Sequence, residues 1–172
     1  EEDIKYSESE GSLSQADPSR VSDYAKLRGK NQLGTLGSGN HFLEIQKVDQ
    51  IFDSQIAKIF GLKQDQITVL IHTGSRGLGH QVCTDWVKVF HNKLSKWKIK
   101  LPDLELSCAP INSPEGQGYF TAMCAAANFA WANRQVITHL TRQVWQNVLS
   151  SSKLKLVYDL AHNIGKIEEH EI

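Results

Sequence analysis

The sequence has few of the features that mark secreted, membrane-spanning or strongly charged proteins. Its three cysteines, Cys83, Cys108 and Cys124, form no C-x-x-C spacing, so neither a disulfide framework nor a zinc ribbon is predicted. No apolar run approaches the roughly 20 residues that a membrane-spanning helix needs. The formal net charge is zero, so any RNA binding must come from local patches of charge. We expect an intracellular protein with reduced thiols and no membrane contact.

The ends of the sequence point to a longer protein. The chain does not begin with Met, and no apolar segment follows a basic start, which argues against a signal peptide. Residues 168–172 stop without any change of pattern. We therefore interpret both ends as cuts, although the 172 residues are enough for one domain with a real core.

The pattern of apolar residues predicts a mixed α/β (α+β) fold in which strands and helices interleave irregularly. A strand is predicted at 42–48, where apolar and polar residues alternate. The β-branched run at 67–71 predicts a buried strand, and a third strand is predicted at 154–160.

Helices are predicted over three ranges, 17–29, 49–61 and 81–98. A further helical region begins at Ser113-Pro114-Glu115, where an N-cap residue precedes proline at the first helical position. Apolar residues then recur at helical spacing to Val148, as one long helix or as two with a bend. At this spacing the large aromatic residues are predicted to be core rather than platforms for stacking RNA bases.

Three histidines lie at the edges of predicted strands. His41 stands between the glycine turn 37–40 and a strand, whereas His72 and His162 follow the ends of apolar strands. Strand ends hold side chains rigidly beside a cleft, and imidazole is the commonest protein ligand of divalent transition metals. A single histidine is more often an ordinary buried or surface residue. The shared setting favours a metal site, but spacing alone does not show that the three converge.

Two glycine-rich segments, 34–40 and 74–79, offer backbone N–H groups of the kind that bind phosphate, and the second precedes a predicted helix N-terminus. Arg76 adds a guanidinium that can bind phosphate with two hydrogen bonds. Neither segment has the spacing of a P-loop, and glycine turns are also ordinary connectors. The basic stretch 88–100 is interpreted as a solvated face in preference to an RNA contact.

Four blocks of sequence resemble the RtcB family of RNA ligases, in the order in which that family has them. They are residues 33–46 (LGTLGSGNHFLEIQ), 71–82 (IHTGSRGLGHQV), 125–134 (AAANFAWANR) and 162–170 (HNIGKIEEH). The resemblance covers most of the chain. It implies that residues 1–172 are the central part of a single catalytic domain, incomplete at both ends.

The resemblance also implies a reaction and its cofactors. Family members join RNA ends that carry a 2′,3′-cyclic phosphate or a 3′-phosphate to 5′-hydroxyl ends, in tRNA splicing and RNA repair. GTP first guanylylates a histidine, GMP then passes to the RNA 3′-phosphate, and two Mn²⁺ ions organise these steps. The implied partners are RNA and GTP, and an activating protein or a multi-protein ligase complex is an open alternative. The implied location is the cytoplasm or, in a eukaryote, the nucleus.

Roles are carried over residue by residue from these blocks. His41 resembles a ligand of one manganese ion, and His72 and His162 resemble ligands of the second. Arg76 matches a basic residue expected near the RNA phosphates. The guanylate pocket is matched by two short stretches, which consist of Asn40, His41, Phe42, Leu43 and Glu44, and of His162 and Asn163.

Other parts of the family's site have no match in this sequence. The family supplies an aspartate and a metal-bridging cysteine from a segment that would precede residue 1, and the cysteines present here do not match that motif. The guanylylated histidine would lie beyond Ile172, so no catalytic residue is assigned; neither His80 nor His170 is that residue. We expect weak metal binding and no nucleotidyl transfer from these residues alone.

Two other functions remain open. The first is a non-catalytic metal- or RNA-binding module, as a truncated or decayed copy of a ligase. The second is a metal-dependent hydrolase that uses the three histidines, for which Glu44 or Glu168 would have to serve as the base.

Overall fold

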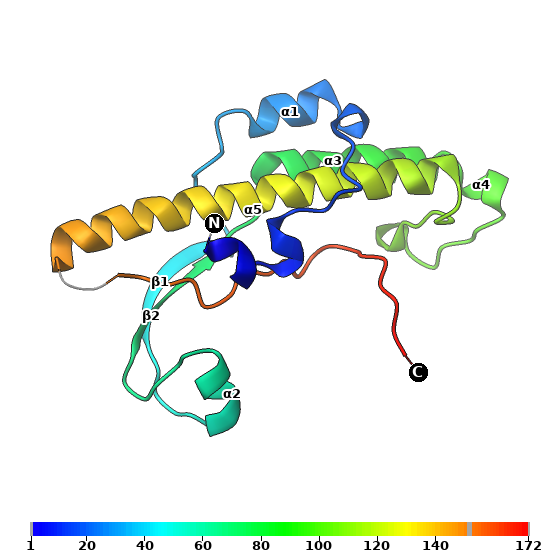
Figure 1. Ribbon diagram of the computed structural model, residues 1–172. Coiled ribbons are helices and arrows are strands. Elements are labelled where there is room, and N and C mark those ends of the chain that lie inside the picture. The colour runs from blue at the N-terminus through cyan, green and yellow to red at the C-terminus, as the bar shows by residue number, and fades with distance from the viewer. Residues whose placement is uncertain (1, 151–152, 172) are drawn as a thin grey trace.

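The computed structural model describes residues 2–150 and 153–171 of the chain. A long helix, α5 (Pro114–Leu149), runs the length of the molecule, with α3 (Arg76–His91) beside it and α1 (Asp23–Gly29) over them (Figure 1). A two-stranded hairpin, β1 (Phe42–Lys47) and β2 (Ile67–His72), extends from the opposite side. The remaining elements are short, namely α2 (Ser54–Ile59), α4 (Leu94–Trp97), η1 (Asp3–Tyr6), η2 (Glu8–Gly11), η3 (Pro18–Arg20) and η4 (Leu104–Leu106). The predicted mixed α/β (α+β) class is confirmed.

Helix α5 begins where its local sequence predicts. The Ser113 hydroxyl accepts a hydrogen bond from Gly116 N at 2.9 Å, and Pro114 occupies the first helical position. The helix then runs without a break to Leu149, so of the two predicted arrangements the single helix is the correct one. Trp131 is buried in a cluster with Leu13, as predicted for a core aromatic. Val144 and Val148 are largely exposed, so the apolar stripe is buried along only part of its length.

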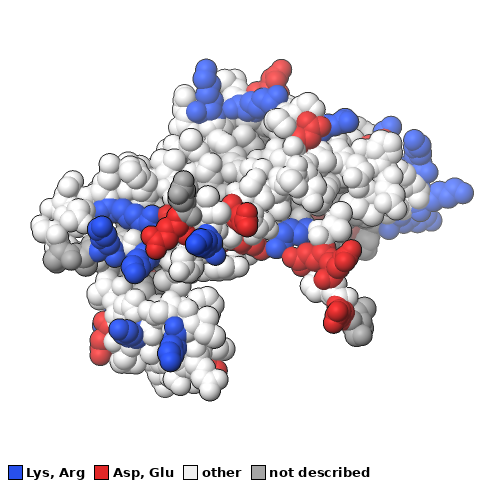
Figure 2. Space-filling view, in the orientation of Figure 1, with Lys and Arg blue, Asp and Glu red and all other residues white. Residues whose placement is uncertain are grey.

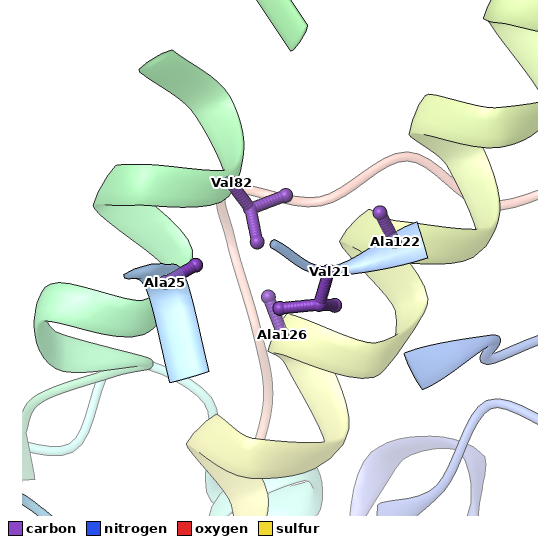
Figure 3. Packing of buried hydrophobic residues seen from close by; sticks show 5 residues of the cluster. All are labelled: Val21, Ala25, Val82, Ala122 and Ala126. Carbon is purple, nitrogen blue, oxygen red and sulfur yellow. The ribbon is translucent and has the colours of Figure 1, made fainter. Parts of the chain in front are cut away.

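The main core lies where α1, α3 and α5 meet, and it is built from small side chains. Its buried members point toward one another from these helices and from the position two residues before α1 (Figure 3); they are Val21, Ala25, Val82, Ala122 and Ala126. Small residues bring the helices close together. A Cβ on Gly29 of α1 would lie 2.8 Å from Leu78 Cβ of α3, and a Cβ on Gly118 of α5 would overlap the Trp86 ring. At these two glycines, α3 lies in close contact with α1 and with α5.

The hairpin pairs β1 and β2 antiparallel, with Phe42 opposite His72 and Lys47 opposite Ile67. The strands at 42–48 and 67–71 are therefore confirmed, but the predicted burial of the second strand is wrong, because Ile67 and Leu70 are each nearly half exposed. In the described ranges β2 pairs only with β1, and neither face of this two-stranded sheet is covered by a helix layer. A β-branched run predicts a strand reliably, but its burial depends on what packs against it.

Three other predictions need correction. The helix predicted over 17–29 is two pieces, η3 capped by Asp17 and α1 capped by Ser22. The helix predicted over 81–98 begins five residues earlier, at Arg76, and is divided into α3 and α4. The helix predicted over 49–61 is reduced to α2, because Asp53 caps it and Gly61, at φ +67°, follows its end.

The strand predicted at 154–160 is wrong as well. Within the described residues this segment forms a single parallel bridge, between Asp159 and Ser7. Asp159 N donates to Tyr6 O at 2.9 Å, and Glu8 N donates to Asp159 O at 2.8 Å. The neighbouring N-terminal residues fold into the turns η1 and η2, so they do not provide an extended strand with which a ladder could continue.

Candidate functional site

The site forms where the hairpin, the C-terminal segment and the glycine turns meet below α5. His72 is the last residue of β2, and its ring lies 5.2 Å from that of Phe42, its partner in the register. The Nδ1 atom of His72 is 2.8 Å from the carbonyl oxygen of Asn40. A carbonyl oxygen can only accept, so Nδ1 carries a proton, and the ring presents its Nε2 atom outward.

His162 arrives at this point from a distant part of the chain. Its Nε2 atom lies 3.3 Å from Nε2 of His72, although 90 positions separate the two residues, and the ring centroids are 5.3 Å apart. The two histidines that the family resemblance assigns to one metal ion therefore lie side by side in the structure. Two nitrogens that face each other at this distance can share a proton in an N–H···N hydrogen bond, or they can share a cation.

The geometry of metal coordination agrees with a cation shared by the two rings. Imidazole nitrogens bound about 2.1 Å from a metal ion, at angles between a right angle and the tetrahedral angle, are about 3.0–3.4 Å apart. The Nε2–Nε2 distance of 3.3 Å falls in this range. The hydrogen bond from His72 Nδ1 to a backbone carbonyl is also the outer contact that metal-binding histidines usually make.

The ring of His41 lies near that of His72, but at a greater distance than the ring of His162 does. Its ring centroid is 6.0 Å from that of His72, edge to face. The Nδ1 atom of His41 is 3.4 Å from Nη1 of Arg76, and because a guanidinium can only donate, this nitrogen must be unprotonated. His41 therefore carries its proton on Nε2 in this arrangement, and a metal ion at Nδ1 would have to replace the Arg76 contact.

The surroundings of His41 keep its ring neutral. Partial burial lowers the pKa of His41 below its ordinary value of 6.5, and the positive charges of Arg76 and His72 lower it further. Arg76 itself is held by a 3.2 Å hydrogen bond from its Nε to the Thr35 hydroxyl. Metal coordination requires a neutral imidazole, so the low pKa of His41 is compatible with the predicted role.

The other residues predicted for the guanylate pocket lie around this centre. Asn40 contributes the carbonyl that His72 binds, and Asn163 is exposed beside His162. Glu44 lies on the same face of β1 as Phe42 and accepts a hydrogen bond from Gln46 Nε2 at 3.0 Å. Leu43 points to the opposite face of the strand, so only its backbone is close to the other predicted pocket residues.

A complete metal site is not present in residues 2–150 and 153–171. No three side chains of the His, Cys, Asp and Glu types are grouped there so that they could hold a metal ion together. The Glu168 carboxylate, proposed as a base for hydrolysis, pairs with Lys166 at 3.0 Å and with His170 at 3.3 Å. The described part of the chain therefore provides a pair of imidazoles with a third nearby.

Sequence reasoning missed two residues that hold this site together, Asn133 and Arg134 of α5. Both are buried, and their side chains bind the segments that carry the three histidines. Their signals in the sequence are their place in the family-like block 125–134 and the interruption of the apolar face of a helix between Trp131 and Ile137.

Charge on the surface is mixed. Figure 2 shows acidic and basic side chains interspersed over one face, with Lys and Arg gathered at the end where α4 lies. Lys93 of the basic stretch 88–100 pairs with Glu115 at 3.3 Å, so part of its charge is compensated. No helix among the described residues is both long and apolar enough to cross a membrane.

Comparison with known proteins gives a consistent result over the whole sequence. A family model described as tRNA-splicing ligase RtcB matches residues 1–172. The tRNA-splicing ligase RtcB of Methanococcus maripaludis is 56% identical over 174 residues, an alignment that covers 99% of this chain and 36% of the relative. The protein of the same name from Archaeoglobus fulgidus is 55% identical over 176 residues, with 100% and 36% covered.

A third relative, the tRNA-splicing ligase RtcB of Methanocaldococcus jannaschii, is 53% identical over 175 residues. That alignment covers 99% of this chain but 18% of the relative. The chain thus spans about a third of the length of the first two relatives and less than a fifth of the third.

Proposed function

Because this chain belongs to the RtcB family, we propose that it is the central part of the catalytic domain of an RNA ligase. The proposed reaction joins RNA 2′,3′-cyclic phosphate or 3′-phosphate ends to 5′-hydroxyl ends, with GTP as the energy source and a histidine–GMP intermediate. The histidine that receives GMP would lie outside residues 1–172. RNA and GTP would be the principal partners, inside the cell.

The contact between His72 and His162 is the observation that carries this proposal. Two imidazoles from distant segments face each other at 3.3 Å, and the outer nitrogen of one is already fixed by the Asn40 carbonyl. Imidazole binds divalent transition metals, and it is the resemblance to the RtcB family that makes Mn²⁺ the proposed ion. In the proposed site His72 and His162 would hold one manganese ion and His41 would hold a second.

Bound manganese would supply positive charge that neutralises phosphate oxygens and makes phosphorus easier to attack. The chain's own residues would orient the reactants around it. Arg76, held against Thr35 and beside His41, would donate to RNA phosphate oxygens. Residues 40–44 and Asn163, which surround the same point, would form one side of the guanylate pocket.

The proposal is tested by two measurements on the full-length protein. The first is ligation of an RNA ending in a 2′,3′-cyclic phosphate to one with a 5′-hydroxyl, with GTP and Mn²⁺. The second is Mn²⁺ binding by calorimetry, for the wild type and for His72→Ala and His162→Ala. His139→Ala, which removes an exposed histidine of α5, is the matched control.

We expect ligation to be lost in both site variants and kept in the control. Mn²⁺ affinity should fall by more than the roughly 10–100-fold that loss of an outer hydrogen-bond partner costs. Equal Mn²⁺ affinity in the wild type and in both site variants would refute the metal site. A wild type that binds Mn²⁺ but joins no RNA ends would refute the ligase.

One observation favours a second function, a non-catalytic metal- or RNA-binding module. The described residues bring together two imidazoles and no third ligand close enough to complete a site. A full-length protein that binds RNA and Mn²⁺ without forming a covalent GMP adduct would support this alternative.

A further inference from the structure

Adjacent residues of α5, Asn133 and Arg134, connect the separate segments that carry the histidines. We infer that these two residues are positioning residues, which set the mutual placement of His41, His72 and His162. The inference rests on the proposed function, because placement of these rings matters only if they act together.

Asn133 joins the two glycine turns. Its side chain is fully buried, and its Oδ1 accepts from Gly34 N at 2.7 Å and from Thr35 N at 3.1 Å. Its Nδ2 donates to the carbonyl oxygens of Thr35 and Gly74, both at 3.1 Å. An amide offers two donors and two acceptor positions, so this side chain is fully used. One buried group thereby fixes the spacing of turns that are about 40 residues apart in the sequence.

From each turn a short series of contacts leads to a histidine. Thr35 accepts from Arg76 Nε at 3.2 Å, and Arg76 in turn contacts His41. The Thr73 hydroxyl donates to Leu36 O at 2.6 Å and ties the residue after His72 to the first turn. A shift of Asn133 would therefore move His41 and His72 relative to each other.

Arg134 makes the matching connection to His162. Its Nε donates to Asp159 Oδ1 at 2.6 Å, three residues before His162, and its Nη1 donates to Thr73 O at 3.4 Å, one residue after His72. The guanidinium also lies 5.9 Å from the centre of the Trp131 ring, which limits its movement. One side chain thus bridges the segments that bring the two facing imidazoles together.

Close packing shows that this part of α5 is fitted to the glycine turn. Gly34 has φ +75°, and a Cβ there would lie 2.7 Å from Cγ1 of Val136, one helical turn beyond Asn133. The turn therefore lies against the helix, with no room for a side chain between them. Thr35 N also donates to Gln32 O within the turn at 3.2 Å, whereas Gly34 N donates to Asn133 Oδ1 at 2.7 Å.

Asn128 provides a matched control on the same helix. Its Oδ1 accepts from Leu13 N at 2.8 Å and its Nδ2 donates to Leu13 O at 3.1 Å, so it also fastens a distant backbone segment. That segment carries none of the three histidines. Asn128→Asp and Asn133→Asp each replace an amide donor by an acceptor, and the fully buried Asn133, with four hydrogen bonds, should lose more stability than the partly buried Asn128.

The test uses the full-length protein in the metal-free form, followed by hydrogen exchange with mass spectrometry and by Mn²⁺ calorimetry. In Asn133→Asp we expect hydrogen exchange to accelerate in residues 33–41 and 72–76. Mn²⁺ affinity should fall about tenfold, which is the smallest loss usually seen when a hydrogen-bond partner of a metal ligand is removed. Asn128→Asp should accelerate exchange near Leu13 and change Mn²⁺ affinity less than twofold.

Arg134→Lys is the second variant, because it keeps the charge next to Asp159 but cannot span Asp159 and Thr73 at once. We expect faster exchange in 72–76 and 153–162, with a similar loss of Mn²⁺ affinity. The inference is overturned if the histidine segments exchange as in the wild type in both variants, or if they loosen while Mn²⁺ affinity is unchanged. A wild type without measurable Mn²⁺ binding would count against the proposed function instead, and selective loosening of the segments would still support their placement by α5.

Discussion

Asp3 and Arg142, 139 positions apart in the sequence, are joined by side-chain hydrogen bonds, one of them from Arg142 Nη2 to Asp3 Oδ1 at 2.9 Å. Arg142 Nε also donates to Leu154 O at 2.9 Å, so one guanidinium holds both the first turn of the chain and the segment after α5. This hydrogen bonding lowers the pKa of Asp3 from 3.8 to about 2, against the opposing effect of burial.

The Asp3–Arg142 pair predicts a loss of stability in acid. The folded state holds Asp3 ionised at a pH where the unfolded chain binds a proton, so the contribution is complete above about pH 4 and is lost as the pH falls toward 2. The free energy of unfolding should fall across this window by up to about 2 kcal/mol more in the wild type than in Asp3→Asn. Urea unfolding at several pH values measures this difference. The exposed Asp49→Asn is the control, and a parallel pH dependence in the wild type and Asp3→Asn would contradict the prediction.

Asp159 should have the opposite pH dependence. Burial raises its pKa above 3.8, and the positive charge of Arg134 offsets only part of this effect. The folded state then holds a proton that the unfolded chain releases, so stability should fall as the pH rises through the window above 3.8. Asp159→Asn should remove that fall while keeping an oxygen that can accept from Arg134 Nε. The same unfolding series tests it, and a fall of equal size in Asp159→Asn would exclude Asp159 as its source.

Gly34 and Gly39 allow backbone strain to be separated from packing. Both have φ +75°, but a Cβ on Gly34 would meet Val136, whereas a Cβ on Gly39 would meet open space. Gly39→Ala should therefore cost about 1 kcal/mol of stability, from the left-handed backbone alone. Gly34→Ala should cost a further 1–3 kcal/mol or so from overpacking, and Val136→Ala should recover part of this. Thermal unfolding of Gly39→Ala, Gly34→Ala, Val136→Ala and the double variant Gly34→Ala/Val136→Ala decides. Equal losses at the two glycines would show that the turn can move away from α5.

His41 should titrate below the ordinary histidine pKa of 6.5. Burial is the largest cause, and the charges of Arg76 and His72 add to it. In Arg76→Gln the pKa of His41 should rise but remain below 6.5, because the burial is unchanged. NMR titration of the imidazole resonances measures the pKa of His41 in the wild type and in the variant. An unchanged pKa of His41 in the variant would show that Arg76 does not act on this ring.

The parts of the fold that could be predicted are those that neighbouring residues determine. Ser113 and Pro114 set the start of α5 by hydrogen bonding and backbone geometry within four residues, and the sequence contains both. The alternation at 42–47 likewise defines β1. The strand predicted at 154–160 failed because a strand needs a partner, and the local pattern does not reveal that residues 3–11 form turns beside it.

The same distinction holds for the site. His41, His72 and His162 could be selected from their positions at strand ends and from their resemblance to family motifs. The contact between His72 and His162 could not be derived from spacing, because it depends on α5. Asn133 and Arg134 were recognised only as part of a family-like block, since their partners lie between 25 and 99 positions away.

Because α5 runs without a break, the number of residues between two of its positions determines the directions in which their side chains point. Ala122 and Ala126 face α3 and the main core, while Asn133 and Arg134 bind the histidine segments further along the same helix. Each residue of an α-helix turns the following ones by about 100°, so one residue inserted between Ala126 and Asn133 would aim the amide away from both glycine turns. An insertion of seven residues, close to two full turns, would restore the direction but displace it by about 10 Å along the axis. Length changes in this stretch should therefore be far less tolerated than substitutions at its exposed positions.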